Sequence, residues 1–129
     1  GLDISGFRLD NYLVTQDELV GKEQRGLEIT YKTFQISRTL ISSIALGGAD
    51  TALRLALSFS LQRQLYSKTA FEIPVVKQRL AEQFTQLLIA DCTALVMVRA
   101  CTWMPKKMSL WSAIIKFLIP KMAEDLVEE

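Results

Sequence analysis

The stretch RQLYSKTAFEIP, from Arg63 to Pro74, lies between two long segments in which apolar residues recur every three or four positions. This step keeps apolar side chains on one face of an α-helix. The first pattern runs from Leu27 to about Tyr66, and the second begins at Val76 and reaches Val98. Pro74 suits the first turn of the second helix, where its missing N–H costs nothing. The stretch therefore predicts a connection between two long helices.

A third apolar stripe, from Trp111 to Leu126, indicates another amphipathic helix. It follows a loop predicted at Cys101 to Met108, with Ser109 as the expected N-cap. Pro120 lies inside this stripe and is expected to kink the helix or to end it early. The predicted fold class is all-α: an up-down bundle of three long helices, which is a four-helix bundle lacking its last helix, preceded by a short β segment.

A bundle of this kind is incomplete. Three amphipathic helices leave an apolar groove at the position of a fourth helix, which is expected after Glu129. Exposed apolar patches bind partners, so we expect a homo-oligomer, either a dimer or a tetramer.

The pair Gly47-Gly48 is the weak point of the first helix, because each mid-helix glycine costs about 1 kcal/mol relative to alanine. One interpretation is the close approach of a neighbouring helix to Gly47, Gly48 and Ala49. The other is a break into two helices, with Asp50 as a new N-cap.

Residues 1–21 differ from the rest of the chain. The segment from Phe7 to Val14 alternates roughly with period two and contains aromatic residues, which predicts a strand. The sequence begins with glycine and without methionine, and we interpret it as a piece of a longer protein.

Composition excludes several classes of function. The net charge is +1, with 15 basic residues scattered among 14 acidic ones, so nucleic acid is not an expected partner. The absence of histidine excludes Ser-His-Asp and Cys-His catalysis within this chain and every His-containing metal site, and no metal ligands are predicted.

The cysteines and the hydropathy indicate a cytoplasmic protein. Cys92 and Cys101 would lie about 13 Å apart on one helix, too far to form a disulfide, so two reduced thiols are expected. The chain has no window of eighteen apolar residues, and the most apolar stretch contains Gln86 and Asp91. We therefore expect no membrane span.

Several spaced residues resemble the acyl-CoA dehydrogenase family. Arg63 and Tyr66 fall on its R-x-x-F-G motif, and Leu-Ala-Glu begins at Leu80, seventeen residues after the arginine. The aromatic-x-x-x-Arg of the first bundle helix is matched by Phe34 to Arg38, and A-x-x-K of the third by Ala113 to Lys116. Phe7 to Gly21 resembles the last strand and turn of the family's β middle domain. The resemblance implies that residues 1–21 are the end of that domain with a linker, and that residues 22–129 are the C-terminal helical bundle.

The resemblance also implies a flavoprotein, an oxidoreductase of fatty acid metabolism. In the family, the arginine and the aromatic of R-x-x-F-G contact the FAD of the neighbouring subunit, so Arg63, Tyr66 and Ser67 are the implied cofactor-binding residues. A planar cation suits a pyrophosphate, and an aromatic face suits a flavin or adenine ring. Without the resemblance, Arg63 is a solvated helix-end cation and Tyr66 a core aromatic. Two departures weaken the flavin site: Ser67 replaces a glycine and Pro74 replaces a glutamine.

Family enzymes remove an α-proton from the acyl thioester with a glutamate while the flavin accepts a hydride from the β-carbon. Some members carry this base on the first bundle helix, where this chain has Ser37, which cannot serve. No catalytic residue is therefore predicted here, and the base is expected downstream. Ser37 and Arg38 are the implied substrate-binding residues for acyl-CoA. The alternative for Arg38 is an ion pair with Asp91 or with another buried acid; Asp91 lies on an apolar face and needs a partner.

Three functions remain open. The first is part of a flavin-dependent acyl-CoA dehydrogenase-like oxidoreductase, which supplies flavin-pocket and oligomer contacts and is inactive alone. The second is a non-catalytic assembly or binding module that has lost the cofactor, as Ser67 and Pro74 would indicate. The third is an unrelated helical bundle that binds another protein.

Overall fold

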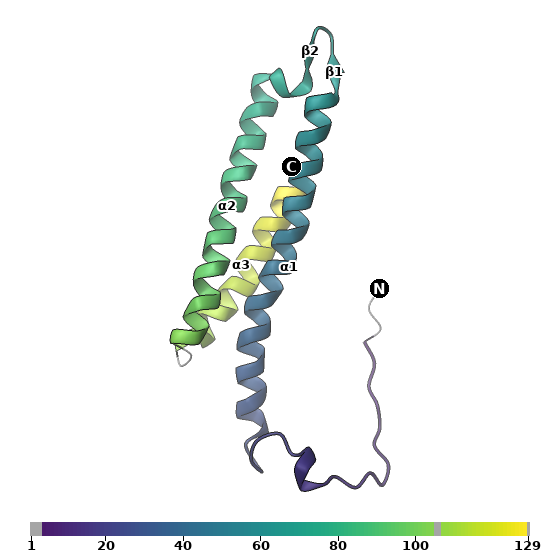
Figure 1. Cartoon of the computed structure of the whole chain (residues 1–129), viewed down its shortest axis with the longest axis vertical. Helices are drawn as coiled ribbons and strands as arrows, with labels where there is room; N and C mark the ends of the chain where they lie inside the picture. Colours follow the sequence, from purple (N-terminus) through teal and green to yellow (C-terminus); the bar gives the residue numbers. More distant parts are fainter. Residues whose placement is uncertain (1–3, 105–106, 129) are drawn as a thin grey trace.

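Three long helices form the bundle. The computed structural model describes residues 4–104 and 107–128. Its helices are α1 (Gly26–Gln62), α2 (Pro74–Trp103) and α3 (Met108–Glu128). Figure 1 shows α1 running up, α2 down and α3 up again, with α1 extending below the other two helices. The predicted up-down arrangement of three helices is confirmed, and Pro74 does begin α2.

A tight β-hairpin and a short 3-10 turn join α1 to α2. Strands β1 (Gln64–Leu65) and β2 (Lys68–Thr69) pair antiparallel, and the turn η2 (Ala70–Glu72) follows. Helix α1 ends at Gln62, earlier than expected, because the carbonyl of Arg63 accepts a hydrogen bond from Ala70 N at 2.8 Å in place of a helical partner. Glu72 accepts from the backbone N–H of Thr69 at 2.7 Å, which caps η2 and holds the pKa of Glu72 below its ordinary value.

The β structure of the chain lies in this hairpin rather than at the predicted strand. Between Ile4 and Arg25 the structure has one 3-10 turn, η1 (Gln16–Glu18), and the residues from Phe7 to Val14 are in no strand. Figure 1 shows this segment as an extended trace apart from the helices. A strand needs a neighbouring strand to satisfy its N–H and C=O groups, and none lies beside this segment in the described part of the chain.

The core lies where the three helices meet. Ile115 and Ile119 of α3 are 1% and 0% exposed and pack in one cluster with Leu46, Ala49 and Leu53 of α1. From α2 the cluster includes Leu87, Ala90 and Ala94. Alanines at the contacts let the helix axes approach closely, while the larger side chains of α3 fill the space between them.

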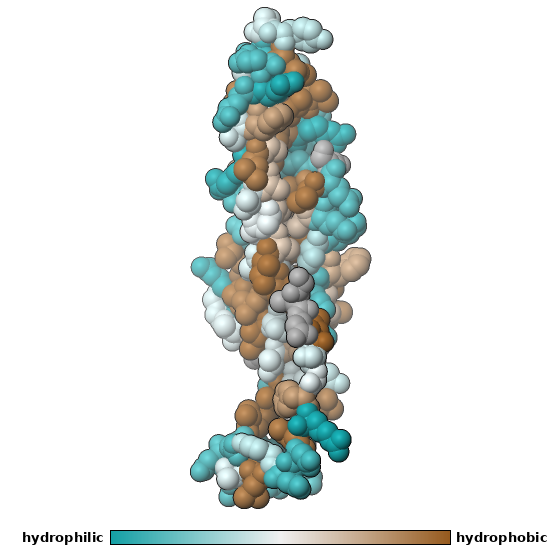
Figure 2. All heavy atoms as spheres, turned by 90° about the vertical axis from the view of Figure 1, so that its right-hand side faces the viewer, coloured by the Kyte–Doolittle hydropathy of each residue, from teal (hydrophilic) through white to brown (hydrophobic). Residues whose placement is uncertain are grey.

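Many apolar side chains remain on the surface. Phe59, Phe84 and Phe117 are 66%, 59% and 75% exposed. Figure 2 views the molecule from the side of α1 and the N-terminal segment, where apolar side chains reach the surface along the whole length.

Helices α1 and α2 are long and apolar enough to cross a membrane by length and composition alone. Core helices of soluble proteins pass the same test, so a membrane span does not follow from it.

Helix α1 continues through Gly47-Gly48, so the predicted alternative of a break at Asp50 is wrong. The expected close approach to the glycines is wrong as well, because a Cβ placed on Gly47 or Gly48 would meet no atom within 4 Å. Ala49 alone of the three is buried, at 2% exposure. The glycines face away from the core, and packing on either side of them holds the helix together.

The third helix differs from expectation at its start and in its length. Ser109 lies inside α3 instead of capping it, and its carbonyl accepts a hydrogen bond from Ser112 Oγ at 3.0 Å. Helix α3 passes through Pro120 to Glu128, so the proline does not end it early. The predicted loop is shorter than expected, because α2 reaches Trp103; within that loop, Pro105 and Lys106 lie outside the described residues.

Two serines are completely buried in the bundle, one on α1 and one on α3. Ser42 and Ser112 are both 0% exposed. Ser112 Oγ donates to the Ser109 carbonyl, whereas Ser42 Oγ has no hydrogen-bond partner in the described part of the chain. A buried polar group without a partner costs about 1–3 kcal/mol of desolvation.

We predict that Ser42→Ala stabilises the protein by about 1 kcal/mol, because it removes this cost and gains helix propensity. The matched variant Ser112→Ala loses a satisfied hydroxyl and should leave stability unchanged or slightly lower. Urea unfolding of the two variants measures the difference. Equal or opposite effects would mean that Ser42 Oγ has a partner in the protein.

Gly48→Ala should also stabilise the protein, by about 1 kcal/mol, because the site is open and alanine is the better helix former. The neighbouring change Ala49→Gly should destabilise by at least as much, since it also empties a buried position. Thermal unfolding of both variants checks the pair. A loss of stability in Gly48→Ala would show that another group covers Gly48.

Candidate functional site

Tyr66 and Ser67 form the two-residue loop of the hairpin. The register pairs Leu65 with Lys68, so these two residues alone make the turn. Tyr66 has a φ of 57°, a value that favours glycine because a Cβ there is crowded by the backbone. Its side chain is fully exposed, with a relative accessibility of 107%. The alternative that Tyr66 is a core aromatic is therefore wrong.

Arg63 lies at the base of the same hairpin and is exposed. Its backbone is held on both sides: its N–H donates to the Phe59 carbonyl at 2.8 Å, and its carbonyl accepts from Ala70 N at 2.8 Å. The exposed Arg63 side chain thus starts from a fixed backbone, three residues before Tyr66. The hairpin presents a cation, an aromatic face and a hydroxyl at one end of the bundle.

Ser37 and Arg38 lie on α1, toward the opposite end. Both are half-buried. Ser37 Oγ donates to the Phe34 carbonyl at 3.3 Å, and the Arg38 guanidinium carbon lies 5.9 Å from the centroid of the Phe34 ring. This distance suits a cation–π contact, which holds the arginine along the helix.

Asp91 is not the buried acid that the sequence predicted. It is exposed and lines an open groove between α1 and α2. In the described part of the chain no ion pair joins it to Arg38. The predicted Arg38–Asp91 pair is therefore wrong: Arg38 contacts the Phe34 ring, and Asp91 lines the groove.

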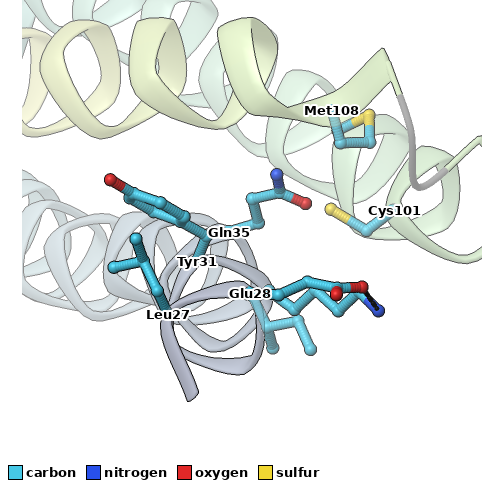
Figure 3. Close-up of a pocket in the computed structure, with 8 residues that line it drawn as sticks. Leu27, Glu28, Tyr31, Gln35, Cys101 and Met108 are labelled. Atoms are coloured by element: carbon cyan, nitrogen blue, oxygen red, sulfur yellow. Dashed lines mark hydrogen bonds and ion pairs between the residues drawn. The ribbon is translucent and has the colours of Figure 1, made fainter. Parts of the chain in front are cut away.

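A cavity of about 730 Å³ lies along α1 from Leu27 to Ile36, where α1 extends past the ends of α2 and α3; Ser37 and Arg38 follow these residues in the helix but do not line the cavity. Leu27, Tyr31 and Ile36 of α1 give it a largely apolar wall, which Cys101 and Met108 close from α2 and α3. Figure 3 shows Gln35 and Cys101 pointing toward the same space, with Met108 at the start of α3 above them. Its volume falls in the range of small-molecule pockets.

Charged residues stand at the mouth of this cavity. Lys32 Nζ lies 2.9 Å from Glu28 Oε1, and Arg25 pairs with the other carboxylate oxygen. Hydrogen bonds from Lys32 and Arg25 hold the pKa of Glu28 below its ordinary value.

Sequence reasoning missed this cavity. The apolar spacing of Leu27 and Tyr31 marked a helix face, but only the structure shows that the other helices stop short of it.

The structure separates the two predicted groups of site residues. Arg38 and Arg63 lie on one continuous helix and its cap, about 38 Å apart at 1.5 Å per residue. Arg63, Tyr66 and Ser67 are together at the hairpin, while Ser37 and Arg38 lie together near the cavity. Within residues 4–104 and 107–128, no three His, Cys, Asp or Glu side chains are grouped so as to hold a metal ion.

Comparison with known proteins identifies the family. The family model described as "Acyl-CoA dehydrogenase, C-terminal domain" matches residues 24–129. The chain therefore belongs to the acyl-CoA dehydrogenase family, whose members are generally flavoproteins. This match overturns the alternative of an unrelated helical bundle. No solved structure matches the chain.

Curated relatives agree with the family. Acyl-CoA dehydrogenase apdG of Emericella nidulans is 33% identical over 79 residues, which cover 61% of this chain and 18% of that protein. Cyclohexane-1-carbonyl-CoA dehydrogenase of Geobacter metallireducens is 30% identical over 87 residues, 67% of this chain and 23% of that protein. Probable acyl-CoA dehydrogenase FadE10 of Mycobacterium bovis is 30% identical over 81 residues, 63% and 12% respectively. The matched region thus spans less than a quarter of each of these relatives.

The strain at Tyr66 leads to a stability prediction. Tyr66→Gly should be more stable than Tyr66→Ala by about 0.5–1 kcal/mol, because only glycine relieves the crowding at positive φ, partly offset by its larger unfolded-state entropy. Neither variant loses packing, since the ring is fully exposed. Urea unfolding compares the two. An alanine variant as stable as the glycine variant would show that the turn is unstrained.

Proposed function

We propose that this chain forms part of a flavin-dependent acyl-CoA dehydrogenase-like oxidoreductase, in which it supplies flavin-pocket, substrate and oligomer contacts and is inactive alone. The observation that carries the proposal is the hairpin that holds Arg63 and Tyr66 exposed at one end of the bundle, on the residues that match R-x-x-F-G. Membership of the family and the names of the relatives support it.

The residues present fit FAD. Arg63 offers a permanent planar cation for a pyrophosphate, and the Tyr66 ring offers a face for an aromatic ring system. Tyr66 is kept in a strained conformation although its ring is fully exposed in the described part of the chain, and such strain is typical of residues held for a function. Ser67 adds a hydroxyl but no glycine flexibility, and Pro74, as the first residue of α2, contributes no side-chain hydrogen bond.

The separation of about 38 Å between Arg63 and Arg38 argues that the two groups serve different sites. The hairpin of one subunit would reach the flavin of another subunit, while Ser37, Arg38 and the nearby cavity would face the acyl-CoA of their own. The bound FAD would accept a hydride from the β-carbon of the acyl thioester. Arg38 would help to hold the anionic substrate, and the apolar wall of Leu27, Tyr31 and Ile36 would exclude water.

The base for the α-proton is proposed to come from outside this chain. Ser37, at the one matching position, has no basic side chain, so the isolated bundle would not turn over. We further propose a cytoplasmic protein without a membrane span and without a nucleic-acid partner, on the basis of its two free thiols and its balanced charge.

The test uses the full-length protein that carries this chain. Its visible spectrum should show a flavin band that bleaches when an acyl-CoA is added without oxygen. Arg63→Gln should raise the Kd for FAD at least about tenfold, because a charge-assisted contact is lost. The matched control Arg99→Gln, an exposed arginine near the end of α2, should leave flavin binding unchanged.

The second candidate is a non-catalytic assembly module, and the departures at Ser67 and Pro74 favour it. A colourless full-length protein that takes up no added FAD would establish this alternative and refute the flavin role of Arg63 and Tyr66.

A further inference from the structure

The end of α2 and the start of α3 together form a tip at which exposed apolar side chains stand beside basic ones. The tip consists of Arg99, Trp103, Met104, Lys107, Leu110 and Trp111. Trp103, Leu110 and Trp111 are 76%, 67% and 50% exposed. Both tryptophans of the chain are therefore at this tip and open to solvent. In Figure 1 this end of α2 lies on the side of the bundle away from the N-terminal segment.

The tip belongs to a stretch of sequence that carries one sign of charge. From Cys92 to Ala123 the chain has five basic residues and no acidic one, although the whole chain has 15 basic and 14 acidic residues. At the far end of this stretch, Lys121 pairs with Glu124 and Asp125. The balanced charge of the chain thus hides a positive excess, which lies toward the tip.

The basic side chains of the tip keep their charge uncompensated. Arg99 and Lys107 are exposed, and neither forms an ion pair with any residue in the described part of the chain. Glu28, on the part of α1 that extends past the ends of α2 and α3, already pairs with Arg25 and Lys32. Both cations of the tip are therefore available to an anionic partner.

Two contacts hold the tip on the bundle. Met108, between the basic and the apolar residues of the tip, is buried at 2% exposure. On the α2 side, Cys101 Sγ lies 3.5 Å from Thr39 Oγ1 of α1. Because the backbone is anchored on both sides, Trp103 and Leu110 are presented outward on a firm support, and little order has to be gained on binding.

On α2 the charge and the aromatic ring point to the same side. Arg99 and Trp103 lie four residues apart in the helix, a step that places two side chains on one face. Val96, three residues before Arg99, continues this face and is 64% exposed. An arginine can lie along apolar surface while its head group reaches a polar layer. This face therefore suits a boundary between an apolar and an anionic medium.

We propose that the tip binds the surface of an anionic membrane, with the rings of Trp103 and Trp111 at the boundary between headgroups and acyl chains. Tryptophan favours this boundary because it has a large apolar ring system and one N–H donor. Arg99 and Lys107 bind the lipid phosphates, since the negative potential of anionic lipids attracts basic side chains. The tip lies on the membrane and does not span it, so all three helices stay in the bundle.

The uniform sign of the tip favours a lipid surface over an acidic protein. Protein interfaces match a defined arrangement of both signs of charge, whereas an anionic membrane is negative throughout and needs no such arrangement. Apolar insertion combined with basic residues is also the pair of signals that peripheral membrane binding requires. This contact does not depend on flavin: a colourless protein that binds vesicles would refute the proposed function and leave the membrane contact intact.

Co-sedimentation of the full-length protein with lipid vesicles tests the proposal. The protein should bind vesicles of phosphatidylcholine with phosphatidylglycerol at least about tenfold more tightly than vesicles of phosphatidylcholine alone, and added salt should weaken this binding. Arg99→Glu/Lys107→Glu should raise the Kd at least about tenfold, because attraction becomes repulsion. Lys107→Arg keeps the charge and should bind like the wild type. Lys68→Glu, an exposed charge reversal on the hairpin, should have no effect.

The aromatic contribution is measured with the same vesicles. Trp103→Ala should raise the Kd at least about tenfold, because it removes the inserted ring. Phe59→Ala removes a ring of similar exposure near the other end of α1 and should leave binding unchanged. Circular dichroism confirms that each variant is folded.

Three results would overturn the proposal. The first is a wild-type protein that does not bind the anionic vesicles. The second is binding that survives both Arg99→Glu/Lys107→Glu and Trp103→Ala. The third is an equal loss of binding in the tip variants and in the controls Lys68→Glu and Phe59→Ala. A wild-type protein that binds soluble polyglutamate but no vesicles would likewise refute the lipid contact and indicate an acidic protein partner.

Discussion

The unbroken hydrogen-bond ladder of α1 is the constraint on which the rest of the structure depends. The helix runs from Gly26 to Gln62, about 55 Å at 1.5 Å per residue. Both other helices pack on it, through Leu46, Ala49 and Leu53. Because it is longer than α2 and α3, one of its ends extends beyond them and creates the cavity near Cys101 and Met108. Its other end holds the hairpin, so its length fixes the distance between the two candidate sites.

The packing of the three helices leaves part of the apolar surface of α1 and α2 uncovered. The side of α1 and α2 that forms the groove is apolar but uncovered, with Phe84 and Leu88 open to solvent. Lys77 and Asp91 line it from α2, and Asp50 lines it from α1.

The sequence could predict the helices and the bundle class, but not every element boundary or which segments find a packing partner. Helical periodicity, Pro74 at the start of α2 and the bundle class follow from local rules, and the structure agrees with them. The predicted strand from Phe7 to Val14 does not form, because alternation only permits a strand and a neighbouring strand must complete it. Ser109 and Pro120 carried local signals for the start and an early end of α3, but burial of Met108 and Ile119 against the bundle extends the helix over both.

By itself, the sequence determined three amphipathic helices, the family motif at Arg63 and Tyr66, and the exclusion of histidine chemistry, because each of these depends on residue identity and spacing alone. Only the tertiary structure decided that Gly47 and Gly48 face open space, that Asp91 is exposed in a groove, and that Tyr66 is held outward at positive φ. The physical reason is that periodicity gives the direction of a side chain around its own helix. What lies in that direction, whether another helix, a cavity or solvent, depends on where the neighbouring helices begin and end.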